Sequence, residues 1–111
     1  MLSRSQRLSG EQVELVMKKG RVFHSSFFWL RTLEYDGKTK IVVIVPQKVV
    51  KTAAGRNLSR RRMYGAIQSL YPLVKTKQLI ILCAKNPVIT IQSMDLVKEI
   101  NNIFVKSKLL E

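Results

Sequence analysis

The chain has few of the residues that usually carry out chemistry. Its 111 residues include one histidine, His24, one cysteine, Cys83, and seven aspartates and glutamates. No acidic residue occurs between Gly37 and Met94. Metal ions are usually held by several carboxylate, histidine or cysteine ligands, and acid–base catalysis needs titratable side chains close together. The sequence therefore predicts no catalytic residue and no metal site in the protein.

Long apolar segments are also missing. The longest apolar runs, residues 41–46 and 79–84, have the length of strands and fall far below the roughly 20 residues of a membrane-spanning helix. No apolar stretch follows the first basic residues, so no secretory signal is predicted. The lone Cys83 lies in the second run and is expected to be a small buried hydrophobe. Together these features predict a cytoplasmic protein with no membrane partner.

Positive charge is what the chain has in excess. Twenty lysines and arginines against seven acidic residues give a formal net charge of +13. A compact chain this basic repels itself, and a polyanionic partner offsets that repulsion. A surface that is merely solvated usually mixes both signs of charge. With 46% apolar residues, the chain can also bury a core, so we expect one nucleic-acid-binding domain over residues 1–111.

Three helices are indicated by their patterns. The first is expected at 10–19, where Ser9 and Gln12 form a capping box and Gly20 ends the helix in a left-handed backbone conformation. The second is expected to begin near Arg56 and to end before Pro72. The third is expected at about 93–108, with Ser93 as its N-cap. Their apolar residues recur at helical spacing.

Strands are predicted at 22–33, 39–47 and 78–83. The first two are joined through Asp36–Gly37, a dipeptide that favours tight hairpins, so they are expected to be antiparallel neighbours. In the first strand, alternation puts Phe27, Trp29 and Arg31 on one face of the sheet. This order of helices and strands describes one α+β sandwich.

A basic segment, residues 48–62, connects the second predicted strand to the second helix. The apolar stripe of that helix points about 170° away from Arg61, so the arginines flank and oppose the core face. Arginine offers a rigid fork of donors for phosphate oxygens, and a helix N-terminus adds unpaired N–H groups. The pattern predicts phosphate binding but does not distinguish RNA from DNA.

Several short motifs in series resemble the bacterial ribonuclease P protein component, the small basic subunit that works beside a catalytic RNA. Residues 56–61, Arg-Asn-Leu-Ser-Arg-Arg, are similar to the arginine motif of that family and follow Gln47–Lys48 at a strand end. Arg7–Leu8, Lys18–Arg21 and residues 24–28 are similar to the opening of the family, and residues 79–85 to a later strand. The resemblance covers about residues 4–108.

The resemblance implies an α-β-β-β-α-β-α sandwich like the second domain of a ribosomal protein, with residues 22–33 broken into two strands. It also implies a left-handed β-α-β crossover, against the usual rule. The implied function is removal of the 5′ leader of precursor tRNA. The RNA subunit would hold the catalytic Mg²⁺ ions, the protein alone would be inactive, and one protein monomer would pair with one RNA.

The same resemblance implies two binding surfaces. One would bind the catalytic RNA, and its expected residues are Lys48, Lys51, Arg56, Asn57, Arg60, Arg61 and Arg62. The other would be a cleft for the leader of precursor tRNA, lined by Val13, Met17, Phe27, Trp29 and Arg31. Stacking of a base on an aromatic ring there is worth roughly 1–3 kcal/mol.

The chain departs from the family pattern at several positions. Gln47 and Leu58 replace basic residues, and Ser59 and Arg62 stand where the family helix is usually apolar, so this helix is expected to be rotated or repacked. Trp29 is expected either in the core or in the cleft. The alternative function is a non-enzymatic, ribosome-associated or general structured-RNA-binding protein. DNA binding ranks third, because no helix combines a base-reading face with an evident dimer partner.

Overall fold

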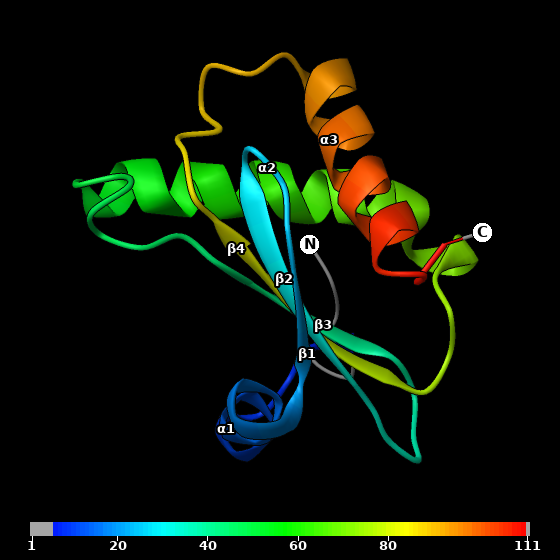
Figure 1. Cartoon of the computed structure of the whole chain (residues 1–111). Helices are drawn as coiled ribbons and strands as arrows, with labels where there is room; N and C mark the ends of the chain where they lie inside the picture. Colours follow the sequence, from blue (N-terminus) through cyan, green and yellow to red (C-terminus); the bar gives the residue numbers. More distant parts are fainter. Residues whose placement is uncertain (1–5, 111) are drawn as a thin grey trace.

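Residues 6–110 of the computed structural model are described, and they form one layered α+β unit. A four-stranded sheet lies in the middle, with α1 on one face and α2 and α3 on the other (Figure 1). The elements in chain order are α1 (Gly10–Lys19), β1 (Arg21–His24), β2 (Phe28–Glu34), β3 (Lys40–Ile44), α2 (Ala53–Leu70), the 3₁₀ turn η2 (Tyr71–Leu73), β4 (Gln78–Ala84) and α3 (Ser93–Lys106). The α+β class and the expected order of elements are confirmed.

The strands lie in the order β1-β2-β4-β3. β1 and β2 are antiparallel, β2 and β4 are antiparallel, and β3 runs parallel to β4. The expected division of residues 22–33 into two strands is therefore confirmed, with the break at residues 25–27. α2 connects the two parallel strands, which completes the expected β-α-β unit.

The predicted hairpin between the strands at 22–33 and 39–47 is wrong. β4 lies between β2 and β3 and takes up the hydrogen bonds that a hairpin would have used. Gly37 also lacks the positive φ angle that a tight hairpin turn requires. The link between β2 and β3 is thus a loop that leaves room for a strand from much later in the chain.

Each face of the sheet has its own apolar core. The larger core lies under α2 and α3, and Phe28, Leu30 and Ile80 are fully buried in it. The smaller core lies under α1 and centres on Val16, Leu79 and Ile81. β4 is buried on both faces along its whole length because it is a central strand covered from both sides.

The structure confirms some of the predicted helix ends and differs from others. The capping box of Ser9 and Gln12 is present, as predicted. Gly20 is extended rather than left-handed, and it is needed for space, because a Cβ there would lie 2.5 Å from the Val16 carbonyl oxygen. Ser93 is the first residue of α3 and not its N-cap, which is Gln92. Within residues 6–110 no helix has the length and apolar character needed to cross a membrane.

Candidate nucleic-acid interface

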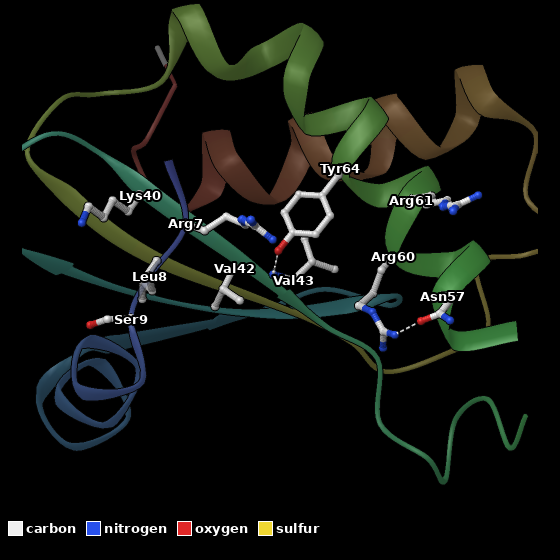
Figure 2. Close-up of a pocket in the computed structure, with 10 residues that line it drawn as sticks. All are labelled: Arg7, Leu8, Ser9, Lys40, Val42, Val43, Asn57, Arg60, Arg61 and Tyr64. Atoms are coloured by element: carbon white, nitrogen blue, oxygen red, sulfur yellow. Dashed lines mark hydrogen bonds between the residues drawn. The ribbon is translucent and has the colours of Figure 1, made fainter. Parts of the chain in front are cut away.

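One face of α2 and the edge strand β3 form a basic pocket of about 640 Å³ (Figure 2). Asn57, Arg60, Arg61 and Tyr64 follow the i, i+3, i+4, i+7 spacing of a single helix face and line the pocket from the α2 side. The remaining lining residues come from β3 and from the segment before α1, and they are Lys40, Val42, Val43, Arg7, Leu8 and Ser9. No carboxylate lines this pocket, which we call the arginine-helix pocket.

A hydrogen bond between α2 and β3 sets the position of the arginines. The Val43 backbone N–H donates to the Tyr64 hydroxyl over 3.0 Å, and both residues are buried. In Figure 2 this bond lies between the Arg7 and Arg60 side chains, and Arg61 points away from the strand. Arg60 donates to the side-chain oxygen of Asn57. Arg61 is exposed and has no hydrogen-bond partner within residues 6–110.

Arg56 performs a different task from Arg60 and Arg61. Its guanidinium donates to the carbonyl oxygens of Val50 and Lys51 at 3.0 and 2.9 Å, and so ties the loop before α2 to the first helical turn. This loop carries the exposed Lys48 and Lys51. The Thr52 hydroxyl caps the helix by accepting from the N–H of Gly55. Arg56 therefore fixes the position of two expected phosphate-binding lysines.

Gly55 is required by the close approach of that loop. A Cβ at this position would lie 2.7 Å from the Thr52 hydroxyl oxygen and 2.8 Å from a methyl carbon of Val50. Both contacts are closer than side-chain atoms normally tolerate. A glycine in the first turn thus lets the lysine-bearing loop pack against the end of α2.

Arg62 connects α2 to a distant loop of the chain. Its guanidinium donates to the carbonyl oxygens of Val88 and Ile89 at 2.6 and 2.7 Å, and also to that of Ile91. These residues lie in the loop between β4 and α3. Arg62 is half-buried and does not line the arginine-helix pocket. Its predicted contact with RNA would have to use donors beyond those already engaged in this loop.

The residues that depart from the family pattern are either hydrogen-bonded or exposed in the structure. Ser59 is fully buried, and its hydroxyl donates to the Gly55 carbonyl oxygen over 2.8 Å, so the buried polar group is satisfied. Leu58 is 48% exposed and Gln47 is exposed. The predicted core face of α2, with Met63, Ala66, Ile67 and Leu70, is buried as expected.

A second group of expected residues meets on the α1 face of the sheet. The Arg31 guanidinium lies 5.9 Å from the centroid of the Trp29 ring and donates to the Met17 carbonyl oxygen over 3.1 Å. Val13 and Trp29 both pack on the small core under α1, and each is partly exposed. We call these four residues, Val13, Met17, Trp29 and Arg31, the Trp29 surface. Trp29 therefore packs on the small core while still presenting part of its ring to solvent.

Phe27 does not join this surface, and its predicted place beside Trp29 is wrong. It lies in the bend before β2 and packs against the large core on the opposite face. The strict alternation assumed from the sequence begins only at Phe28, where the strand starts. Phe27 also lines a pocket with Asp95, Glu99 and Lys98, whose net charge is negative and therefore disfavours phosphate.

Acidic, histidine and cysteine side chains are few in the described part of the chain. No three His, Cys, Asp or Glu side chains among residues 6–110 are grouped so that they could hold a metal ion. Burial raises the pKa of the Cys83 thiol to about 11, against a smaller lowering by the charge of Lys48. A thiol with so high a pKa is a poor nucleophile at neutral pH. The chemistry available here is binding through cations, hydrogen-bond donors and an aromatic ring.

The sequence-based prediction named Asn57, Arg60 and Arg61 and missed the other lining residues of the arginine-helix pocket, three of which contribute charge or an anchoring hydroxyl. Arg7 and Lys40 approach α2 from segments distant in the sequence, and Tyr64 supplies the anchoring hydroxyl. Lys40 lies in the acid-free stretch and Arg7 in the basic opening, so their charge could have marked them as candidates. Their meeting at the edge of β3 depends on the sheet topology, which local patterns do not reveal.

Known proteins resemble this chain in sequence and in fold. A family model described as Ribonuclease P matches residues 2–108. A curated relative, the "Ribonuclease P protein component" of Rippkaea orientalis, is 26% identical over 108 residues, covering 92% of this chain and 85% of the relative. The solved structure of the Staphylococcus aureus RNase P protein has a TM-score of 0.84 at 15% identity and covers 97% of this chain and 100% of its own. That of the Thermotoga maritima RNase P protein has a TM-score of 0.80 at 13% identity, with coverage of 90% and 96%.

Proposed function

Because this chain belongs to the ribonuclease P protein family and is a protein subunit of ribonuclease P, we propose that it binds the catalytic RNA and the 5′ leader of precursor tRNA. The observation that carries this proposal is the arginine-helix pocket. Four basic side chains, Arg7, Lys40, Arg60 and Arg61, line one surface that contains no carboxylate. The family match gives no support to the alternative of a general structured-RNA-binding protein.

The arginine-helix pocket suits phosphate groups for physical reasons. Arg61 has donors free of other contacts within residues 6–110, and each contact with a phosphate releases condensed counterions from the RNA. The Tyr64–Val43 bond holds the helix against the sheet, so the backbone that carries these cations is already in place and the cost of ordering falls on their side chains. Lys48 and Lys51 extend the basic surface along the loop that Arg56 fixes. We assign the catalytic RNA to this pocket and loop.

The Trp29 surface suits a single RNA strand. Arg31 is held by the Met17 carbonyl and lies over the Trp29 ring, where its planar guanidinium can face a base or a phosphate. Trp29 offers a partly exposed ring on which a base can stack. We assign the 5′ leader of precursor tRNA to this surface, without Phe27.

Catalysis itself is assigned to the RNA subunit. The side chains of residues 6–110 do not form a cluster that fits a catalytic Mg²⁺ ion, and the basic surfaces repel free cations. Mg²⁺ would bring a nucleophilic water and stabilise the phosphate transition state, and the RNA would hold it. The protein would then position both RNAs, as one monomer per catalytic RNA, in the cytoplasm.

Salt-dependent binding tests the role of α2. The double variant Arg60→Ala/Arg61→Ala is compared with wild type and with Lys85→Gln/Lys98→Gln, which loses the same charge outside both surfaces. Each lost phosphate contact should reduce the slope of log K against log salt by about 0.7–0.9. The probe is the ribonuclease P RNA of the same genome. An equal change of slope in the two double variants would contradict the assignment of this pocket.

A further inference from the structure

A second basic pocket lies on the β1 side of the sheet and shares no lining residue with the arginine-helix pocket. It has a volume of about 290 Å³, and four cationic residues line it: Lys19, Arg21, Lys75 and Lys108. They come from the end of α1, the start of β1, the turn before β4 and the segment after α3. We call this site the β1-side pocket. The family resemblance includes Lys19 and Arg21 in its opening segment but gives them no role, and the sequence does not reveal that Lys75 and Lys108 join them.

The cations of this pocket are not balanced by acidic neighbours. Glu34 is the one carboxylate in its lining, and its pair with Lys75, at 3.8 Å, joins two well exposed side chains. Such exposed pairs contribute little. Bringing four positive charges together has an electrostatic cost in the free protein. That cost is offset when an anion binds among them.

The backbone around the pocket is firmly held. The Lys75 N–H donates to the Leu109 carbonyl oxygen over 2.8 Å, and the Lys75 carbonyl accepts from the Thr39 hydroxyl over 2.7 Å. The same hydroxyl oxygen accepts from the N–H of Gln78. Lys75 and Lys108 are therefore brought together from distant parts of the chain by a defined set of hydrogen bonds.

Buried polar groups form the base of the pocket. Thr32, Gln78 and Ser107 each expose less than a tenth of their surface. The Thr32 hydroxyl donates to the Gln78 side-chain oxygen over 2.9 Å, which leaves the NH₂ group of that amide as a donor. The Ser107 hydroxyl donates to the Phe104 carbonyl oxygen over 3.1 Å, so the Gln78 NH₂ group is the donor at the base of the pocket that matches an acceptor oxygen of a phosphate.

Two lysines here adopt a backbone conformation that usually belongs to glycine or asparagine. Within residues 6–110 the non-glycine residues with positive φ are Lys77, at 60°, and Lys108, at 64°. Lys77 precedes Gln78, and Lys108 lines the pocket. Left-handed backbone in residues with a Cβ is unfavourable and is often retained for function. Lys77 itself does not line the pocket, whereas Lys108 keeps a cationic side chain at a lining position where glycine or asparagine would adopt the backbone conformation more easily.

We propose that the β1-side pocket binds phosphate groups of an RNA backbone, as an RNA contact separate from α2 and from the Trp29 surface. The proposal rests on the RNA-binding function above. It differs from that function in location, because Thr32 and Gln78 lie on the sheet face that packs against α3, whereas Trp29 lies on the α1 face. An RNA that reaches this pocket extends the interface around the edge of the sheet at β1.

The test compares two double variants that lose the same charge. Lys75→Gln/Lys108→Asn alters the pocket, and asparagine tolerates the left-handed backbone at residue 108. Lys85→Gln/Lys98→Gln is the matched control. Binding to the ribonuclease P RNA is measured over a range of salt concentrations, and a thermal melt shows that each variant is folded.

The pocket variant should lower the slope of log K against log salt by about 1.4–1.8, for two lost phosphate contacts, while the control changes it clearly less. Equal changes in the two variants would overturn the proposal and would mean that the lysines act only through overall charge. If the wild-type protein failed to bind the RNA at all, the proposed function itself would fall.

A second measurement distinguishes an RNA chain from a free anion. The side-chain NH₂ signal of Gln78 is followed by NMR during titration with oligouridylate and, separately, with inorganic phosphate. The signal should shift and saturate with the oligonucleotide at a concentration at least tenfold lower. Saturation by inorganic phosphate at the same concentration would identify a small-anion site and overturn the assignment to RNA.

Discussion

The backbone N–H of Val43 donates to the hydroxyl of Tyr64 over 3.0 Å and so joins the edge strand β3 to α2. β3 is an edge strand, and its outer N–H groups lack a neighbouring strand. The tyrosine satisfies one of them and also places the face of Arg60 and Arg61 beside Lys40. Fold stability and the geometry of the arginine-helix pocket therefore depend on the same contact.

Removing this hydroxyl should destabilise the protein. Tyr64→Phe leaves the Val43 N–H buried without an acceptor, at a cost of about 1–3 kcal/mol in the free energy of unfolding. Tyr35→Phe is the control, because its hydroxyl binds the Lys38 carbonyl in an exposed loop. Urea unfolding of the two variants measures the difference. Equal losses of stability would mean that the hydrogen bond between Val43 and Tyr64 stabilises the fold no more than an exposed hydrogen bond does.

Neighbouring arginines on α2 should have separable effects. Arg62→Ala removes donors to three carbonyl oxygens of the loop between β4 and α3, so it should cost about 1–3 kcal/mol of stability. Arg61→Ala should leave the melting temperature nearly unchanged and reduce the salt slope of RNA binding by about 0.7–0.9. Melting curves and salt titrations of both variants check this. The reverse pattern would show that Arg62, and not Arg61, is the RNA contact.

The Trp29 surface should distinguish precursor from mature tRNA. Trp29→Ala removes one stacking platform and should weaken binding of a precursor with a leader of several nucleotides by roughly 1–3 kcal/mol. Mature tRNA, which has no leader, should bind as before. Because Trp29 also packs on the small core, a thermal melt of the same variant is needed. Equal losses for both tRNA forms, with a large fall in melting temperature, would assign Trp29 to the core alone.

Phe27 provides the matched control for that experiment. It packs on the opposite face of the sheet, beside Asp95 and Glu99. Phe27→Ala should therefore leave the ratio of precursor to mature tRNA affinities unchanged, whatever it does to stability. A selective loss of precursor binding in this variant would restore the arrangement expected from sequence alternation and contradict the one described above.

The Cys83 thiol should be unreactive in the folded protein. It is 2% exposed, and burial raises its pKa from 9.0 to about 11. Folding therefore favours the protonated thiol, so this contribution to stability is complete below pH 9 and is lost as the pH rises through 11. Alkylation by iodoacetamide at pH 8 should be slow in buffer and fast in urea. Similar rates in both would contradict the burial of the thiol.

Short sequence patterns predicted the structure of the residues that form them, but they did not predict pairings that depend on distant parts of the chain. The capping box of Ser9 and Gln12 depends on four consecutive residues, so the start of α1 could be read directly. Asp36–Gly37 gave the wrong pairing because β4, contributed by residues about 40 positions later, lies between the two strands. No local pattern reveals such an insertion, since its energy comes from contacts formed only in the folded sheet.

In the candidate site, too, residues close in sequence could be grouped in advance, whereas contacts between distant segments could not. The spacing of Asn57, Arg60 and Arg61 along one helix was enough to place them on a common face opposite the core. The carbonyl ligands of Arg62 lie 26 or more residues away, so its charge alone could not separate it from its neighbours. The β1-side pocket could not be predicted for a similar reason, because its four cations come from three separate parts of the sequence, at residues 19–21, 75 and 108.

Cleavage of precursor tRNA by purified components is the most direct test of the account. The protein alone, the ribonuclease P RNA alone and the two together are incubated with precursor tRNA over a range of Mg²⁺ concentrations. Since residues 6–110 contain no group of side chains fit for a catalytic metal, the protein alone should not remove the 5′ leader at any Mg²⁺ concentration. Adding it to the RNA should raise site-specific cleavage, and Arg60→Ala/Arg61→Ala should weaken that effect. Site-specific cleavage by protein shown to be free of RNA would contradict the account.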